Sequence, residues 1–128
     1  MRLLLDTHAF MWAVLEPERL SGPARDALED LDNEVWASSV NAWELAIKRR
    51  TGKLALPPDG PERLRAAIAE STFKPLPVTF DHAFAVHRLD RHHGDPFDRI
   101  LVAQALVEGM TLVSRDHQLR QYPVGLLW

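Results

Sequence analysis

Short apolar runs alternate with longer amphipathic segments along the chain, a pattern typical of α/β domains. The run Arg2–Leu5 predicts a first, buried strand, because its three leucines leave no polar alternation. Further strands are predicted at 35–37, 110–113 and 124–127. The segment 74–78 contains two prolines, which restrict it to the edge of a sheet. About five short strands separated by helices predict an α/β domain with a mainly parallel central sheet.

Helices are predicted between these strands from the 3.6-residue spacing of apolar side chains and from their capping residues. They cover residues 7–15, 23–32, 39–50, 62–71, 80–89 and 96–108, with a helical turn at 116–121. Ser38 or Ser39 caps the third helix, Thr79 caps the fifth, and Gly109 is the expected end of the sixth. A proline-rich loop at 56–61 divides the chain, but each half is small for its own core. We therefore expect residues 1–128 to form a single domain.

Composition excludes several classes of protein. The 128 residues are 46% hydrophobic and contain no cysteine, so disulfides, thiolate nucleophiles and iron–sulfur clusters are excluded. No apolar stretch reaches the roughly 18 residues that a membrane span needs, and the N-terminus does not resemble a signal peptide. A soluble, cytoplasmic protein is expected. The net charge of −3 argues against a module that binds nucleic acid through a broad basic surface.

Four acidic residues have unusual positions in this predicted architecture. Asp6 and Asp116 each lie just beyond a predicted strand, where ligands bind in open α/β sheets. Glu44 and Asp98 lie at or beside the apolar faces of their predicted helices. A buried carboxylate is costly unless it has a partner, and carboxylate oxygens suit hard divalent ions such as Mg²⁺ or Mn²⁺. If the four acids converge, the sequence predicts a metal site for phosphodiester cleavage.

Each acid also has a local explanation, and both interpretations stay open at this point. Asp6 and Asp116 can serve as helix N-caps. Glu44 can form a salt bridge with Lys48 one helical turn later, and Asp98 is favoured in the first turn of its helix by the helix dipole. Only their joint occurrence favours a common site.

Several segments, in order over nearly the whole chain, resemble the PIN domain and in particular the VapC-type toxins. They are Leu-Leu-Leu-Asp-Thr-His-Ala-Phe-Met-Trp at 3–12, Ser-Ser-Val-Asn-Ala-Trp-Glu-Leu at 38–45, Asp-Pro-Phe-Asp-Arg at 95–99, Ala-Gln-Ala at 103–105, Ser-Arg-Asp at 114–116 and Tyr-Pro at 122–123. The resemblance implies a three-layer α/β/α fold. It also implies a ribonuclease that acts as the toxin of a type II toxin–antitoxin pair and is inhibited by a VapB-like antitoxin.

The resemblance further implies site residues, a cofactor and partners. Asp6, Glu44, Asp98 and Asp116 correspond to the acids that bind Mg²⁺ or Mn²⁺ and catalyse RNA hydrolysis in this family. Asp95 is then a helix cap or an outer-shell partner of the metal site. Thr7 is a second outer-shell candidate, which would orient Asp6 or a metal-bound water. A homodimer is also implied.

Four basic residues are candidate contacts to the RNA backbone. Lys48 and Arg49 belong to a basic cluster that is more typical of a solvated helix end than of an RNA contact. Arg99 and Arg115 adjoin predicted ligands, where they would contact phosphate or pair with the acids.

The histidine-rich region and three of the tryptophans are expected to have structural roles. A surface helix and a turn explain a histidine-rich region better than a metal cluster does, and three tryptophans lie on or near apolar stripes. The histidines are His82, His87, His92 and His93, and the tryptophans expected in the core are Trp12, Trp36 and Trp43.

Three rival functions are weighed. A phosphatase of the haloacid dehalogenase type also has an aspartate after its first strand, but it needs a second two residues later, where His8 stands. The others are a noncatalytic interaction module with the PIN fold and a PIN nuclease that acts in RNA processing outside a toxin–antitoxin pair.

Overall fold

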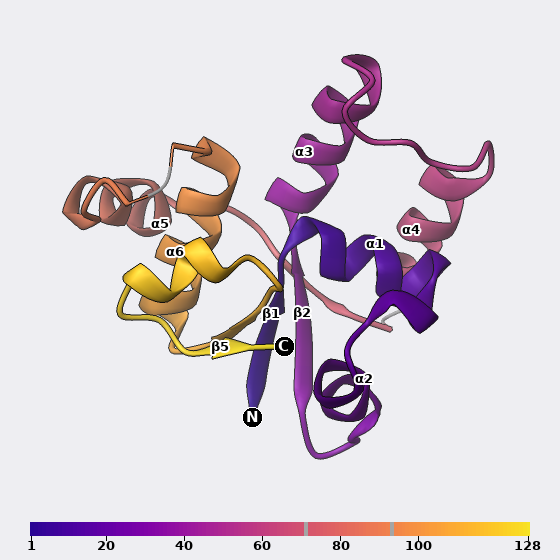
Figure 1. The fold of residues 1–128 in the computed structure, drawn as a ribbon, viewed down its shortest axis with the longest axis horizontal. Helices are drawn as coiled ribbons and strands as arrows, with labels where there is room; N and C mark the ends of the chain where they lie inside the picture. The colour runs from indigo at the N-terminus through magenta and orange to yellow at the C-terminus, as the bar shows by residue number, and fades with distance from the viewer. Residues whose placement is uncertain (71, 93) are drawn as a thin grey trace.

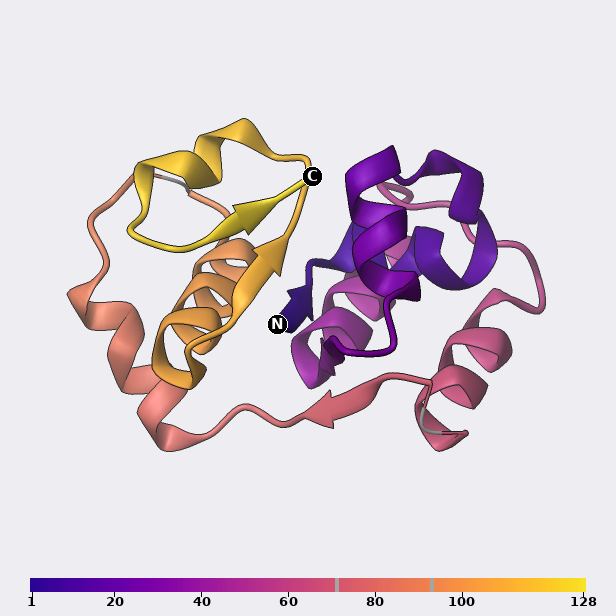
Figure 2. The same ribbon diagram turned by 90° about the horizontal axis from the view of Figure 1, so that it is seen from below.

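A parallel sheet lies between two layers of helices (Figure 1). The structure is a computed structural model that describes residues 1–70, 72–92 and 94–128. Helices α1 (Thr7–Leu15), α2 (Gly22–Glu29) and α4 (Gly60–Ala69) lie on one side of the sheet, and α6 (Pro96–Glu108) lies on the other (Figure 2). This arrangement confirms the predicted α/β/α architecture.

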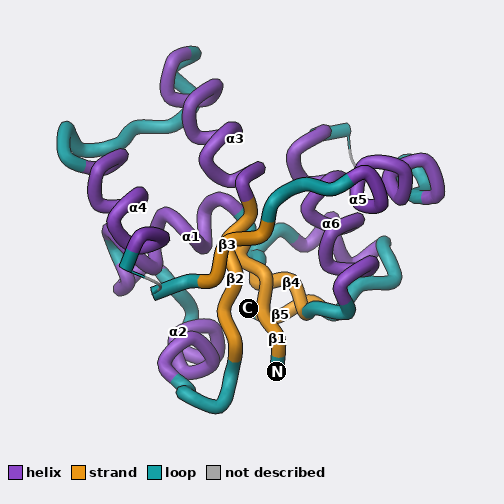
Figure 3. Tube along the Cα trace, turned by 180° about the vertical axis from the view of Figure 1, so that it is seen from behind, coloured by secondary structure: helices purple, strands orange, loops and turns teal. Residues whose placement is uncertain are grey.

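All strand pairings in the sheet are parallel. In spatial order the strands are β3 (Lys74–Leu76), β2 (Glu34–Ser38), β1 (Arg2–Leu5), β4 (Thr111–Val113) and β5 (Leu126–Leu127). The first strand of the chain is therefore central, and the proline-containing strand is at the edge, as predicted. Because Leu5 pairs with both Ala37 and Val113, strands β2, β1 and β4 end at the same level. The residues that follow them are brought together there (Figure 3).

The predicted helices are present, with small differences at their ends. They are α1 (Thr7–Leu15), α2 (Gly22–Glu29), α3 (Ser39–Arg50), α4 (Gly60–Ala69), α5 (Phe80–Ala85) and α6 (Pro96–Glu108). Short 3-10 turns occupy Pro17–Arg19, Val86–Arg88 and His117–Gln121. The second helix is shorter than predicted because Asp30 takes an extended conformation. The fourth begins two residues earlier, since the loop prolines include the helix-starting Pro61. Its predicted end at Ser71 lies outside the described residues.

The central strand contributes to two separate hydrophobic cores. Leu3 and Leu5 pack with α1, α2 and α4, whereas Leu4 packs with α6 on the opposite face. All three side chains are completely buried, as expected for alternating side chains in a strand that is covered on both sides. This burial fixes the register of β1 and therefore the position of the residue after it, Asp6.

The tryptophans only partly match their predicted places. Trp12 is buried and contacts Trp128 at the C-terminus, and Trp36 is half-buried. Trp43, predicted in the core, is instead 60% exposed. Its ring lies against the edge of Phe97 from α6, so it covers the junction of two helices without entering the sheet core.

Among the described helices, none has the length and apolar character needed to cross a membrane.

Candidate functional site

The carboxyl ends of β1 and β4 position the first two polar side chains of the site. Asp6 follows β1, and its backbone N–H donates to the Val113 carbonyl at the end of β4, at 3.0 Å. The Asp6 side chain accepts a hydrogen bond from the Ala9 N–H at 2.7 Å, so it caps α1. Ser114, one residue past β4, donates its hydroxyl to the same carboxylate. The capping interpretation of Asp6 is confirmed, and it places the carboxylate at the edge of the sheet.

A cavity of about 720 Å³ lies beyond these strand ends and collects all four predicted acids. Asp95 also faces it. Its lining consists of Asp6, His8, Glu44, Lys48, Asp95, Asp98, Arg115, Asp116, His117 and Gln118. We call this the acidic cavity. Residues that are far apart in the sequence therefore share one polar space.

Glu44 is buried and is held by two donors. Its Oε1 accepts the Thr7 hydroxyl, and its Oε2 accepts the ammonium group of Lys48. Only 2% of the residue is exposed. The predicted pair between Glu44 and Lys48 is therefore present, but it lies in the acidic cavity and is not a surface pair.

Lys48 also reaches a second acid. Its Nζ lies 3.1 Å from Asp95 Oδ2, while Asp95 Oδ1 accepts the N–H of Phe97 and caps α6. Burial by itself would lower the pKa of Lys48, but hydrogen bonds to Glu44 and Asp95 outweigh it and raise that pKa. Burial opposes ionisation of Asp95 as well, yet the Lys48 and Phe97 hydrogen bonds lower its pKa. The charged ammonium group of Lys48 already bonds two carboxylates. Its position therefore does not favour the predicted contact with the RNA backbone.

At Asp6, by contrast, hydrogen bonds do not offset the effect of burial on the pKa. Burial raises its pKa from 3.8 to about 6, although hydrogen bonds from Ser114 and Ala9 oppose the shift. The negative charges of Glu44 and Asp116 raise the pKa further. Burial also lowers the pKa of His8, so this imidazole adds no positive charge at neutral pH. The region around Asp6 would therefore gain stability from a bound cation.

The remaining two acids lie at or near the N-terminal ends of helical segments. Asp116 Oδ1 accepts the Gln118 N–H at 2.9 Å and caps the last 3-10 turn, as its local interpretation predicted. Ser114 Oγ accepts the Asp116 N–H at 3.1 Å. Asp98 lies in the first turn of α6 and is half-buried. Both carboxylates line the acidic cavity.

The donors of the acidic cavity suit a hard cation in their chemistry. They are carboxylates, the ligands that Mg²⁺ and Mn²⁺ prefer, and burial together with the charges of Glu44 and Asp116 raises the pKa of Asp6. Across residues 1–70, 72–92 and 94–128, no three Asp, Glu or His side chains converge closely enough to hold an ion as they stand.

Comparison with known proteins agrees with this geometry. The PIN domain family model matches residues 3–125. The chain belongs to the PIN-domain family. It is 30% identical over 127 residues to Ribonuclease VapC22 of Mycobacterium tuberculosis, an alignment that covers 94% of this chain and 91% of the relative. The resemblance to VapC-type PIN domains is thus confirmed.

Solved structures share the PIN fold at low sequence identity. VapBC2 from Rickettsia felis has a TM-score of 0.74 at 18% identity and covers 98% of this chain and 97% of its own. A toxin–antitoxin complex from Klebsiella pneumoniae has a TM-score of 0.64 at 20% identity, with coverages of 97% and 94%. These similarities establish the same overall chain path.

Two buried polar residues of this PIN domain were missed from the sequence. Asn41 donates to the Leu5 carbonyl and to Thr7 Oγ1, and it accepts the N–H of Ser38. It is completely buried. The Ser-x-x-Asn spacing of a capping box was a readable signal for it. Ser114 had no comparable signal, because its contact with Asp6 depends on the pairing of β1 with β4.

Two of the predicted RNA contacts lie outside the lining of the acidic cavity. The Arg99 guanidinium donates to the carbonyls of Val86, Leu89 and Asp90 and to the Tyr122 hydroxyl. These four bonds hold the segment after α5 against the C-terminal region, so Arg99 is structural. Arg49 does not line the acidic cavity.

Arg115 keeps its predicted place. It lines the acidic cavity, and its guanidinium lies 4.6 Å from the centre of the Trp12 ring.

The histidine interpretation also needs correction. His82 was expected on a surface helix, but it is completely buried. Its Nδ1 accepts the Thr79 N–H at 3.0 Å, and its Nε2 lies 2.8 Å from Glu108 Oε1. His87 and His92 remain at the surface, and His93 lies outside the described residues.

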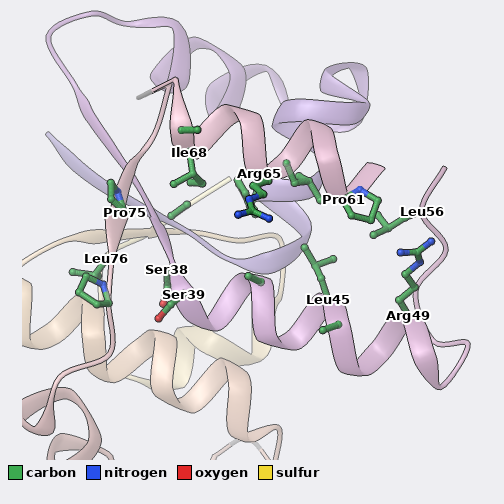
Figure 4. A pocket seen from close by; sticks show the side chains of 17 residues that line it. Ser38, Ser39, Leu45, Arg49, Leu56, Pro61, Arg65, Ile68, Pro75 and Leu76 are labelled. Carbon is green, nitrogen blue, oxygen red and sulfur yellow. The ribbon is translucent and has the colours of Figure 1, made fainter. Parts of the chain in front are cut away.

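A second, mainly apolar groove lies between α3, α4 and β3 (Figure 4). Its volume is about 790 Å³. Apolar side chains such as Leu45, Ile68 and Leu76 line it, together with Arg49 and Arg65. We call it the apolar groove. Helix α3 contributes Glu44 and Lys48 to the acidic cavity but Leu45 and Arg49 to the groove, so its two faces serve different spaces.

Proposed function

We propose that this protein is a metal-dependent ribonuclease that acts as the toxin of a toxin–antitoxin pair. The observation that carries the proposal is the convergence of Asp6, Glu44, Asp98 and Asp116 on one cavity of a PIN domain. The similarity to a relative named as a ribonuclease supports RNA as the substrate.

The site would hold Mg²⁺ or Mn²⁺. Asp6, Asp98 and Asp116 are the proposed ligands, and Glu44 is a further ligand or the acceptor of a proton from the attacking water. The chemistry supplied by such an ion is charge stabilisation at the scissile phosphate and activation of water. The burial of Asp6 beside the negative charges of Glu44 and Asp116 favours this assignment.

The protein's own residues contribute orientation and electrostatics. Ser114 and the Ala9 N–H orient the Asp6 carboxylate, while Thr7 and Lys48 fix the Glu44 carboxylate. Arg115, held against Trp12, is the proposed contact to an RNA phosphate. With no cysteine in the chain and no Ser–His pair expected from the sequence, we propose hydrolysis without a covalent protein intermediate.

A cleavage assay tests the proposal. Purified protein should cut RNA when Mg²⁺ or Mn²⁺ is present and should stop when EDTA is added. Asp98→Asn and Asp6→Asn should each lower the rate by at least about 100-fold. Asp26→Asn, on the exposed face of α2, makes the same chemical change away from the cavity and should leave the rate unchanged. Full activity of Asp98→Asn would contradict the assignment.

A VapB-like antitoxin is the proposed protein partner, and the apolar groove is its proposed binding site. Similar structures come from toxin–antitoxin complexes, and the groove is largely apolar with two arginines that would pair with acidic residues of a partner. Ala46→Glu places a charge at an exposed position in the groove. It should abolish binding to the small protein encoded by the adjacent reading frame while RNA cleavage persists.

Two alternatives would give other results. A noncatalytic PIN module would show no Mn²⁺ binding in calorimetry and would not cut RNA. A PIN nuclease of RNA processing would cut RNA, but its expression would not arrest growth in a way that the adjacent gene product relieves.

We also propose a cytoplasmic homodimer built from this single domain. Phe80 and Phe84 stack on each other on α5, with ring centroids 6.2 Å apart, and are 83% and 62% exposed. Such exposed aromatic pairs are typical of interfaces. Light scattering should give a dimer mass for the wild type and a monomer mass for Phe84→Glu.

A further inference from the structure

The ammonium group of Lys48 joins two carboxylates of the acidic cavity. It bonds Glu44 within α3 and lies 3.1 Å from Asp95, the N-cap of α6, which is 47 residues further along the chain. The ring of Phe97 lies on another side, with its centre 5.6 Å from Nζ. Only 20% of the Lys48 side chain is exposed. A cation supplied by the chain itself is thus fixed in this part of the cavity.

Both carboxylates held by Lys48 have donors on each of their oxygens. Glu44 accepts Thr7 at Oε1 and Lys48 at Oε2. Asp95 accepts the Phe97 N–H at Oδ1, at 2.8 Å, and Lys48 at Oδ2. Within the chain, therefore, these two acids are already provided with donors.

A divalent ion bound between Glu44 and Asp95 would have to displace the ammonium group. The displaced ammonium group would lose both of its carboxylate partners, and the ion would have to offset that loss. A two-metal site needs ligands for both ions a few ångströms apart, so the loss of these two acids leaves too few for a second ion. Asp6, Asp98 and Asp116 line the same cavity and supply the carboxylates for the first ion.

We propose that Lys48 is a built-in cation that occupies the Glu44–Asp95 side of the acidic cavity and limits the protein to one divalent ion. That ion would be held by Asp6, Asp98 and Asp116. Lys48 is then a positioning residue that holds the carboxylates of Glu44 and Asp95. These two acids are not direct ligands of the ion. This inference rests on the proposed function, because it assumes that a divalent ion binds.

Titration of the metal-free, full-length protein with Mn²⁺ in a calorimeter tests the proposal. The wild type should bind one Mn²⁺ per chain. Lys48→Met should bind a second, weaker Mn²⁺, because Glu44 and Asp95 lose their cation. Lys48→Arg keeps a positive charge and should bind one. Lys53→Met is the matched control, since it removes an exposed lysine near the end of α3, and it should also bind one.

A second variant keeps the test decisive if Lys48→Met does not fold by circular dichroism. Asp95→Asn retains an N-capping side chain. It should weaken Mn²⁺ binding by less than about tenfold, the low end for a residue that is not a direct ligand. Asp98→Asn, which removes a proposed ligand, should weaken binding by at least about 100-fold.

The outcomes separate this inference from the proposed function. Two Mn²⁺ ions on the wild type, one on folded Lys48→Met, or equal weakening by Asp95→Asn and Asp98→Asn would overturn the role of Lys48. These results would leave the nuclease assignment intact. A wild type that binds no Mn²⁺ and cuts no RNA would overturn the proposed function, and the inference with it.

Discussion

Thr7 Oγ1 donates a hydrogen bond to Glu44 Oε1, and these residues are 37 positions apart in the sequence. The same Thr7 oxygen accepts a hydrogen bond from Asn41 Nδ2 at 3.1 Å. With one bond donated and one accepted, the rotation of the hydroxyl is fixed. Only 2% of Thr7 is exposed. The residue after the first acid thus connects the end of β1 to the acid-bearing face of α3.

Replacing this hydroxyl should destabilise the fold and disturb the site. Thr7→Val keeps the shape of the side chain but removes one buried hydrogen-bond partner from Glu44 and one from Asn41. We expect the free energy of unfolding in urea to fall by about 1–3 kcal/mol. RNA cleavage by the folded protein should also become slower, because Glu44 loses its orientation.

Thr7→Ser is the matched control, since it retains the hydroxyl. It should cleave RNA at nearly the wild-type rate, although it loses a buried methyl group. Equal stabilities of Thr7→Val and wild type would show that the hydrogen bond contributes nothing.

The raised pKa of Asp6 predicts that stability without metal falls as pH rises. An acid with a folded-state pKa of about 6 and an unfolded value of 3.8 is protonated in both states below pH 3.8. As pH rises through 6, the folded state must hold a buried negative charge. The shift corresponds to about 3 kcal/mol of lost stability by neutral pH.

Asp6→Asn should remove this dependence while it keeps an N-capping oxygen. In urea titrations with EDTA, the wild type should lose about 2–3 kcal/mol relative to Asp6→Asn between about pH 4 and pH 7. The variant should be the more stable protein at neutral pH, although it no longer binds Mn²⁺. A stability difference that does not change with pH would refute the assigned pKa.

Breaking a buried series of side-chain hydrogen bonds outside the acidic cavity should lower the stability of the protein. Ser38 Oγ donates to Gln104 Oε1 at 2.6 Å, and Gln104 Nε2 lies 3.3 Å from His82 Nδ1. Gln104 is completely buried. Gln104→Leu leaves the Ser38 hydroxyl without its acceptor, and the free energy of unfolding should fall by about 1–3 kcal/mol.

Gln121→Leu makes the same substitution at an exposed position. It should change stability by no more than about 0.5 kcal/mol. If the two variants were equally stable, the buried chain would have no net stabilising role.

The positions of two arginines predict different effects on RNA binding. Arg115 lines the acidic cavity, whereas Arg49 lines the apolar groove. In the inactive Asp98→Asn background, Arg115→Ala should weaken RNA binding and reduce the slope of log affinity against log salt by about one. Arg49→Ala should leave both quantities unchanged. Fluorescence anisotropy at several salt concentrations measures them, and the reverse order would contradict the assignment.

Local sequence signals were sufficient for most of the fold. The three leucines before Asp6 predicted a buried central strand, and Pro96 with Gly109 predicted both ends of α6. Pro75 and Pro77 predicted an edge strand because proline cannot donate to a sheet on both sides. Each signal depends on residues a few positions apart, which is why it could be read without a structure.

Helix ends without such signals were less accurate. The second helix was expected to reach residue 32, but it ends at Glu29, where Asp30 becomes extended. The segment around His82 was expected at the surface, yet its partners are Gln104 and Glu108, more than twenty residues away. Burial of this kind depends on how α5 packs against α6, and a local pattern does not contain that information.

For this protein the sequence by itself determined the strands, the helices and the four acids at their ends and faces. Strand ends and helix faces follow from short-range periodicity and from the conformational limits of proline and glycine. Only the tertiary structure decided how the acids are shared. It placed Asp95 beside Lys48, which the sequence already paired with Glu44, and it brought Ser114 to the Asp6 carboxylate. These two contacts join residues far apart in the sequence, so they depend on the packing of helices against the sheet.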